Sequence, residues 1–132
     1  MQRTINGIVI HCSASPQGRG DDAEVIHRWH RERGWSGIGY HWVILEDGTR
    51  QAGRPEYWQG SHVRGRNADT VGVCLIGEAT FQDAQMAALG DTVRELLTRY
   101  PDATVYGHCD LDPAKTCPNF NVGEFIQGLY LV

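Results

Sequence analysis

Two histidines and a cysteine stand out as residues whose types and spacing could do chemistry. His11 and His108 fall at the carboxyl ends of short apolar runs, and Cys117 follows nine residues after His108 in the loop PAKTCPN. Strand ends and the loops after them are where rigid scaffolds present functional groups. Histidine and cysteine are good zinc ligands, and three protein ligands that leave a position for water describe a catalytic zinc. The spacing indicates a candidate zinc site, but two core histidines and an unused cysteine would give the same pattern.

The other three cysteines are expected to have no part in that site. Side chains alternate along a strand, so Cys12 and Cys109 should point away from the side on which His11 and His108 lie. Cys74 sits in the middle of another apolar run. A buried free cysteine usually packs as a small apolar residue, and we expect all three to do so. The absence of a CxxC pair argues against a zinc ribbon and against a thioredoxin motif.

Short apolar runs and helical periodicities predict the elements that position these residues. Runs rich in Ile and Val predict strands, and Asp47-Gly48 predicts the turn of a hairpin. The expected strands are 5–12, 40–45, 49–53, 71–76 and 103–108. The first expected helix begins at Asp21 or Asp22 and ends at Gly34. The second begins at Thr80, with Asp83 as its capping partner, and ends before Pro101. The third begins at Asn121, with Glu124 as its capping partner. Intermixed strands and helices predict an α/β or α+β fold, one mixed sheet with helices on its faces, in a single domain over 1–132.

Composition excludes several classes of function. The chain has 132 residues and a net charge of −4, which argues against nucleic acid as a partner because its binders usually carry a basic patch. No apolar run reaches the ~18 residues of a membrane span. The first residues lack the basic start and apolar stretch of a signal peptide. We therefore expect a protein made in the cytoplasm that contacts no membrane, with a monomer as the default state.

The chain also resembles a known family through a set of motifs in a fixed order. The motifs are IVIHCSAS at 8–15, IHRWHRERGW at 26–35, IGYHWVILEDGT at 38–49, AGR at 52–54, GSHVRGRN at 60–67, VGVCLIG at 71–77 and PAKTCPNF at 113–120. Each is weak alone, but the ordered set runs over nearly the whole chain. It is similar to the zinc-dependent N-acetylmuramoyl-L-alanine amidases of the type-2 amidase and peptidoglycan-recognition superfamily, in particular the lysozyme-amidases of T-odd bacteriophages.

The resemblance implies a site, an activity and a fold. It makes His11, His108 and Cys117 the ligands of one Zn²⁺, and it places Tyr40 and Lys115 on the catalytic positions. It implies hydrolysis of the amide bond between N-acetylmuramic acid and L-alanine in peptidoglycan, in wall degradation or host lysis. The implied fold is a central mixed sheet of about five strands flanked by helices. One departure is that the segment from His108 to Cys117 is one residue longer than in the related proteins.

Three further residues are candidates for substrate contact. His62 and Asn67 lie in the loop motif GSHVRGRN, and Trp58 lies in the loop EYWQG. Each has a plain structural alternative: His62 as a surface residue, Asn67 as a cap of its loop, and Trp58 as a core residue. His41 alternates with Tyr40 along the expected strand, so we expect it to be buried or hydrogen-bonded rather than catalytic.

Two other functions use the same residues. A non-catalytic peptidoglycan-recognition module would share the fold, but such modules typically lack the full ligand set that is present here. A cysteine hydrolase would use Cys117 as nucleophile and His108 as base, without a metal. The resemblance implies peptidoglycan or muropeptides as the partner and action at the cell wall after release by a separate factor such as a holin. It also raises binding to a phage RNA polymerase, for which this acidic chain carries no signal of its own.

Overall fold

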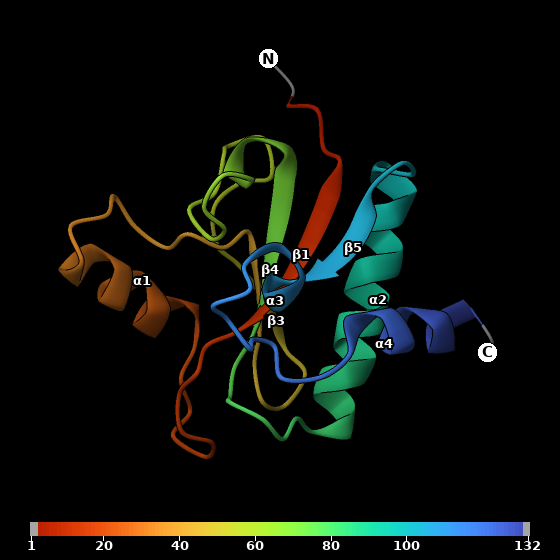
Figure 1. The fold of residues 1–132 in the computed structure, drawn as a ribbon. Helices are drawn as coiled ribbons and strands as arrows, with labels where there is room; N and C mark the ends of the chain where they lie inside the picture. The colour runs from red at the N-terminus through yellow and green to blue at the C-terminus, as the bar shows by residue number, and fades with distance from the viewer. Residues whose placement is uncertain (1–2, 131–132) are drawn as a thin grey trace.

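A mixed sheet forms the centre of the fold (Figure 1). It has five strands in the order β3-β2-β4-β1-β5. The computed structural model describes residues 3–130. The strands are β1 (Gly7–Cys12), β2 (Trp42–Ile44), β3 (Arg50–Ala52), β4 (Thr70–Leu75) and β5 (Thr104–Gly107). β1 pairs in parallel with β4 and β5, and β2 pairs in parallel with β4, whereas β3 is antiparallel to β2. The predicted fold class is confirmed.

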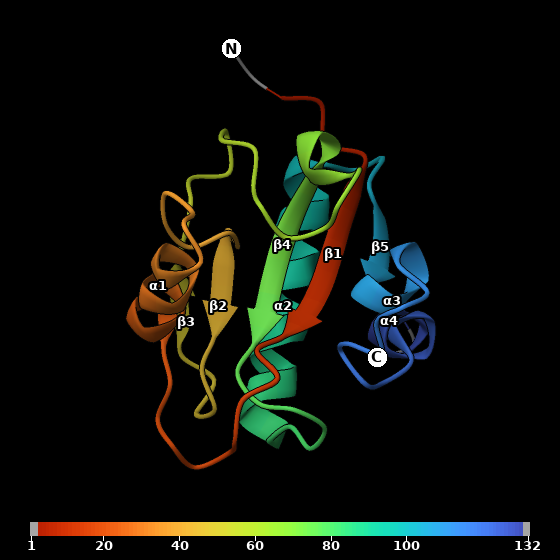
Figure 2. The ribbon, with the colours of Figure 1, turned by 60° about the vertical axis from the view of Figure 1, so that its left-hand side comes forward.

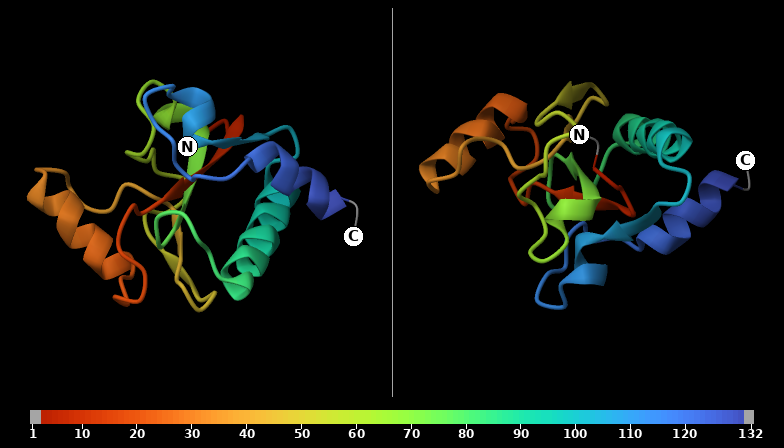
Figure 3. Two further views of the ribbon diagram at one scale, coloured as in Figure 1. Left: turned by 60° about the horizontal axis from the view of Figure 1, so that its bottom comes forward. Right: turned by 90° about the horizontal axis from the view of Figure 1, so that it is seen from above.

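Helices cover both faces of this sheet (Figures 2 and 3). They are α1 (Ala23–Glu32), α2 (Asp83–Arg99), α3 (His108–Leu111) and α4 (Val122–Tyr130), with a single 3₁₀ turn, η1 (Asn67–Asp69), before β4. α1 lies on one face, and α2 and α4 lie on the other (Figure 3). All residues of β1 and β4 are buried, as expected for parallel strands that are covered on both sides. Within residues 3–130, no helix is long and apolar enough to cross a membrane.

The two faces of the sheet pack into two separate cores. The core between the sheet and α2 includes Ile8 and Ile10 of β1, and the core on the α1 side is built around Ile26 and Val43. Side chains alternate along a strand, and Ile8 and Ile10 face α2. His11 therefore projects toward the α1 side of the sheet. It lies near the carboxyl end of β1, on the face of the sheet that carries α1.

Caps decide where two of the helices begin, as the sequence predicts. Asp22 accepts a hydrogen bond from the backbone N–H of Val25 at 3.0 Å and starts α1. Asn121 accepts one from the backbone N–H of Glu124 at 2.9 Å and starts α4. Both carboxylate and amide side chains satisfy backbone donors that have no partner inside the helix.

The predicted start of α2 at Thr80 is wrong, because Gln82 is the N-cap. Gln85 reaches back to the backbone N–H of Gln82, and its amide also donates to the carbonyls of Ile44 and Ile76 at the end of the sheet. Gln85 is buried, so these bonds attach the first turn of the helix to β2 and to the end of β4. A long-range contact of this kind outweighs the local N-cap preference of threonine.

Candidate metal centre

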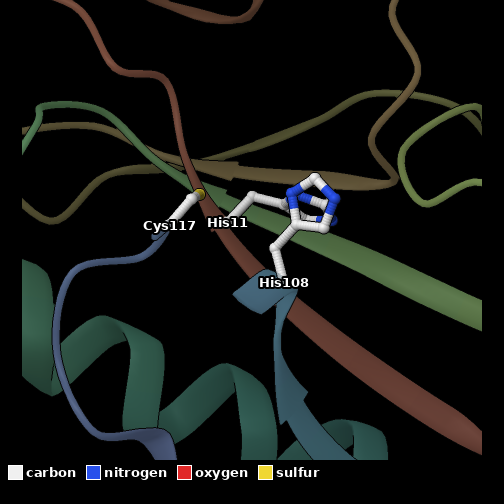
Figure 4. A group of neighbouring side chains, drawn as sticks. All are labelled: His11, His108 and Cys117. Carbon is white, nitrogen blue, oxygen red and sulfur yellow. The ribbon is translucent and has the colours of Figure 1, made fainter. Parts of the chain in front are cut away.

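The three predicted ligands come together in space. One potential ligand atom from each of His11, His108 and Cys117 lies within 4.8 Å of the other two. His11 is the fifth residue of β1, His108 is the first residue of α3 directly after β5, and Cys117 lies in the loop that follows α3 (Figure 4). β1 and β5 are parallel neighbours, so their carboxyl ends meet at one edge of the sheet. His108 was expected as the last residue of a strand, but it opens α3 because Asp110 accepts a hydrogen bond from the backbone N–H of Gly107.

The imidazoles of His11 and His108 turn their Nδ1 atoms toward each other, 3.1 Å apart (Figure 4). Two nitrogens bound to one tetrahedral zinc at about 2.0–2.1 Å lie roughly 3.3 Å apart. The observed spacing therefore fits a shared metal ion. Burial lowers the pKa of His11 well below its ordinary value and also lowers the pKa of His108. Both rings are neutral near pH 7, which is the form of histidine that binds metals.

Cys117 is held against the end of β1. Its Sγ accepts a hydrogen bond of 2.7 Å from the backbone N–H of Cys12, and its carbonyl accepts one of 2.9 Å from the backbone N–H of Cys109. The second bond closes the loop between α3 and Cys117. A hydrogen bond between the two thiols lowers the pKa of Cys12 to about 7 and raises that of Cys117. In the metal-free protein the first proton of this pair therefore leaves Cys12, and Cys117 must lose its own proton to bind a metal as a thiolate.

The predictions for the other cysteines have different outcomes. Cys74 is fully buried in the core on the α1 side, as predicted. Cys109 is only partly buried, so its placement as a core residue is wrong. Cys12 is buried, but its thiol contacts Cys117 rather than apolar side chains alone. The Cys117 loop packs over the end of β1 at Cys12, and strand alternation alone does not predict this contact.

His62 lies behind His11 and not on an open surface. Its Nδ1 is 2.8 Å from Nε2 of His11, and the residue is 9% exposed. Burial lowers the pKa of His62 to about 3, so it stays neutral. The expectation that His62 contacts substrate from a loop is therefore corrected: its ring contacts a metal-ligand candidate from inside the protein.

Tyr40 packs beside His11, and Lys115 lies in the loop two residues before Cys117. The ring of Tyr40 is centred 5.0 Å from that of His11, and burial raises the pKa of its phenol well above the ordinary value. Lys115 is exposed, and its backbone N–H donates to Asp112 at 3.0 Å in the loop before Cys117. Burial lowers the pKa of His108, Asp112 opposes this, and the charge of Lys115 lowers it further. The charge of Lys115 therefore acts on one of the three ligand candidates, His108.

The remaining candidates take structural positions or stay apart from the ligands. Oδ1 of Asn67 accepts hydrogen bonds of 2.8 Å from the backbone N–H groups of His62 and Val63, so it fixes its loop. His41 is buried, accepts from the backbone N–H of Gly72 and bonds to the carbonyl of Trp58, as predicted. Trp58 is 58% exposed, so it is not a core residue. It borders a pocket of about 390 Å³ whose lining includes none of the three ligands, and its contact with substrate stays a prediction.

Comparison with known proteins agrees with this geometry. Residues 1–120 match the profile of the N-acetylmuramoyl-L-alanine amidase family. The chain belongs to this amidase family. The endolysin of Escherichia phage T7 is 37% identical to it over 99% of this chain and 91% of the relative. The solved N-acetylmuramoyl-L-alanine amidase LysC from Clostridium intestinale superposes with a TM-score of 0.87 at 34% identity, covering 97% of this chain and 87% of that one.

A further solved structure shows how far the fold extends. Drosophila PGRP-LB has a TM-score of 0.81 at 23% identity, over 98% of this chain and 81% of that one, which shows the shared fold alone. The predicted membership of the type-2 amidase and peptidoglycan-recognition superfamily is confirmed. The enzyme class follows from that membership: the chain is an amidase that hydrolyses peptidoglycan.

Sequence reasoning about this amidase missed Cys12, which contacts the ligand candidate Cys117, and Thr70, which contacts His62 behind His11. A signal for Cys12 was available in its position next to His11, but alternation gave it the wrong environment. Thr70 contacts His62, and its signal was the glycine two residues later in β4. Gly72 weakens a strand, and a glycine inside a strand often marks a place where another group approaches closely.

Proposed function

We propose that this amidase is a zinc enzyme that cuts the bond between N-acetylmuramic acid and the L-alanine of the stem peptide. The observation that supports it best is the convergence of His11, His108 and Cys117, which are distant in sequence, on one point. Two neutral imidazoles and a thiolate would leave a centre of net charge +1 with a position open for water. Zinc bound there would supply Lewis-acid activation of that water and of the scissile carbonyl.

Tyr40 acts in this proposal as a hydrogen-bond donor. Because burial raises the pKa of its phenol, the side chain is protonated at neutral pH and is no general base. Its ring lies beside the ligand candidate His11. A donor aimed at the oxygen that becomes negatively charged stabilises the transition state more than the substrate.

Lys115 supplies the second stabilising group. Its loop is fixed at two points, by its own backbone bond to Asp112 and by the bond between Cys109 and Cys117. An exposed lysine on such a loop can reach over the ligand group, where its charge already lowers the pKa of His108. In this proposal the positive charge of Lys115 neutralises the oxyanion, and the hydroxyl of Tyr40 donates a hydrogen bond to it.

The substrate in this proposal is intact peptidoglycan or soluble muropeptides, and the site of action is the cell wall. Purified peptidoglycan would be digested with the zinc-loaded protein, and the products would be analysed by mass spectrometry. We expect peptides with a free L-alanine amino group and intact glycan strands. New reducing sugar ends without free alanine amines would contradict the proposal, because they are the product of a glycosidase.

A chelator distinguishes zinc from nucleophilic catalysis at Cys117. We expect activity to disappear after treatment with a chelator and to return when one equivalent of zinc is added. Full activity in the chelator would favour the cysteine hydrolase, with His108 as the base. We expect elemental analysis of the purified protein to find about one zinc per chain.

A further inference from the structure

A chain of polar contacts leads from the backbone to the back of the metal-ligand candidate His11. Nε2 of His11 lies 2.8 Å from Nδ1 of His62. Nε2 of His62 lies 3.3 Å from Oγ1 of Thr70, and that hydroxyl donates to the carbonyl of Arg66 at 2.7 Å. The chain thus starts at a fixed acceptor and ends at the ring whose Nδ1 faces His108.

The direction of each proton follows from the first group in this chain. The carbonyl of Arg66 can only accept, so the single proton of the Thr70 hydroxyl points to it. Thr70 must then accept from His62, which places a proton on Nε2 of His62. A neutral imidazole has one N–H, so Nδ1 of His62 is an acceptor and takes the Nε2 proton of His11. Nδ1 of His11 therefore keeps a free lone pair, on the side where a metal would bind.

Two glycines make room for the ring of His62. A Cβ atom added to Gly72 would lie 2.7 Å from Cγ of His62, and one added to Gly60 would lie 2.7 Å from its Cδ2. Both distances are closer than real Cβ contacts allow. Asn67 accepts from the backbone N–H of His62 and fixes the segment that carries it. Gly72, Gly60 and Asn67 thus together fix the position of the ring.

We propose that His62 is a positioning residue of the metal centre, which holds His11 in the tautomer and ring orientation that leave Nδ1 free to bind the ion. This inference rests on the proposed zinc site. Partners behind a ligand histidine fix its tautomer and raise its basicity, and their loss typically costs 10–100-fold in metal affinity. Usually the partner is a carboxylate or a carbonyl; here a second histidine does this work, and Thr70 in turn fixes the tautomer of His62.

Zinc affinity tests this role without using peptidoglycan. His62→Leu removes the acceptor, whereas His62→Asn keeps an oxygen near the position of Nδ1. By competition with a chromophoric chelator, we expect His62→Leu to bind zinc roughly 10–100-fold more weakly and His62→Asn to stay closer to the wild type. His27→Leu is the matched control, because His27 is exposed and lies outside the ligand group, and its affinity should be unchanged. Wild-type affinity in a folded His62→Leu protein would overturn the proposal.

Nuclear magnetic resonance of the ¹⁵N-labelled, metal-free wild type provides a test that needs no variant to fold. Long-range ¹H–¹⁵N couplings report which ring nitrogen carries the proton. We expect both His11 and His62 to be protonated at Nε2. A proton on Nδ1 of His11 would overturn the proposal, even if His62→Leu fails to fold. If the protein bound no zinc at all, the proposed function would fail, while this measurement would still show whether His62 fixes the tautomer of His11.

Discussion

The backbone N–H of Cys12 donates a hydrogen bond of 2.7 Å to the thiol sulfur of Cys117, across 105 positions of sequence. The bond fixes the sulfur of a loop residue to the last residue of β1, next to His11. Two cysteines have different roles: Cys117 belongs to the ligand group, whereas Cys74 lies in the core.

Cys117→Ala is expected to lose both zinc and amidase activity, because two neutral imidazoles alone bind the ion weakly. Cys74→Ala should keep both and lower the free energy of unfolding by about 1 kcal/mol through the lost buried sulfur. Zinc content, turnover and urea unfolding would be measured on the same preparations. Zinc bound at wild-type affinity in the Cys117 variant would remove Cys117 from the ligand set.

Lys115→Ala is expected to fold, to keep its zinc and to hydrolyse peptidoglycan at least ~100-fold more slowly, as is typical when one oxyanion donor is removed. Lys115 is the only lysine in the sequence, so amine-selective reductive methylation modifies this side chain and the α-amino group alone. Methylation keeps the positive charge, and the methylated enzyme should therefore retain more activity than the alanine variant. Near-normal turnover of Lys115→Ala would leave the zinc site intact but discard this role.

Glu56 should be more important for stability than its place in a surface loop indicates. Its carboxylate accepts from the indole N–H of Trp42 at 2.8 Å, from the hydroxyl of Tyr100 at 2.6 Å and from Arg99 at 2.6 Å. Glu56→Ala leaves these donors without a partner and should lower the free energy of unfolding by about 2–4 kcal/mol. Glu95→Ala is the control, since Glu95 is an exposed partner of Arg50 and Arg99 and should cost under about 1 kcal/mol. Equal effects of the two variants in urea unfolding would contradict this ranking.

Stability should fall in mildly acidic solution because two buried histidines resist protonation. Burial lowers the pKa of His30 and of His41 to about 4, and each accepts a hydrogen bond from a backbone N–H. In the unfolded chain both titrate near 6.5, so below that pH the unfolded state binds more protons than the folded state. The free energy of unfolding of the metal-free protein is therefore expected to decrease as the pH falls from about 6.5 to 4. A flat profile over that range would show that these rings are protonated in the folded state.

The sequence predicts the elements of this fold well and their ends less well. The apolar runs and the Asp47-Gly48 turn mark the strands, because burial on both faces or on one face leaves a pattern in the sequence. The start of α2 depends on Gln85, whose amide bonds to carbonyls of Ile44 and Ile76 in another part of the chain. No local rule contains such a contact, so the start of this helix could not be placed from Thr80 and Asp83.

The candidate site shows the same division. His11, His108 and Cys117 could be selected because ligand chemistry limits the residue types and because strand ends present functional groups. The residues around the ligands could not be predicted from the sequence, because loop closure and sheet register bring Cys12, His62 and Thr70 to this part of the fold. The loop motif of His62 predicts substrate contact or a surface position, whereas the loop folds inward over Gly72, where there is no side chain. The glycine in β4 was the usable sign, but it does not say which ring fills the space.

The separation of the three ligands along the chain gives a bound ion a mechanical role. An ion shared by His11, His108 and Cys117 would connect the first strand to the segment after the last strand, and so would enclose most of the polypeptide in one ring. A permanent cross-link over a loop of about 100 residues lowers the conformational entropy of the unfolded chain. This loss stabilises the folded state by roughly 4–5 kcal/mol at room temperature. An ion acts reversibly, so its removal would release both ends of the fold together. The metal centre of this amidase would then be a reversible cross-link as well as a catalytic group. Loss of the metal in a chelating environment would lower both the resistance to proteolysis and the turnover.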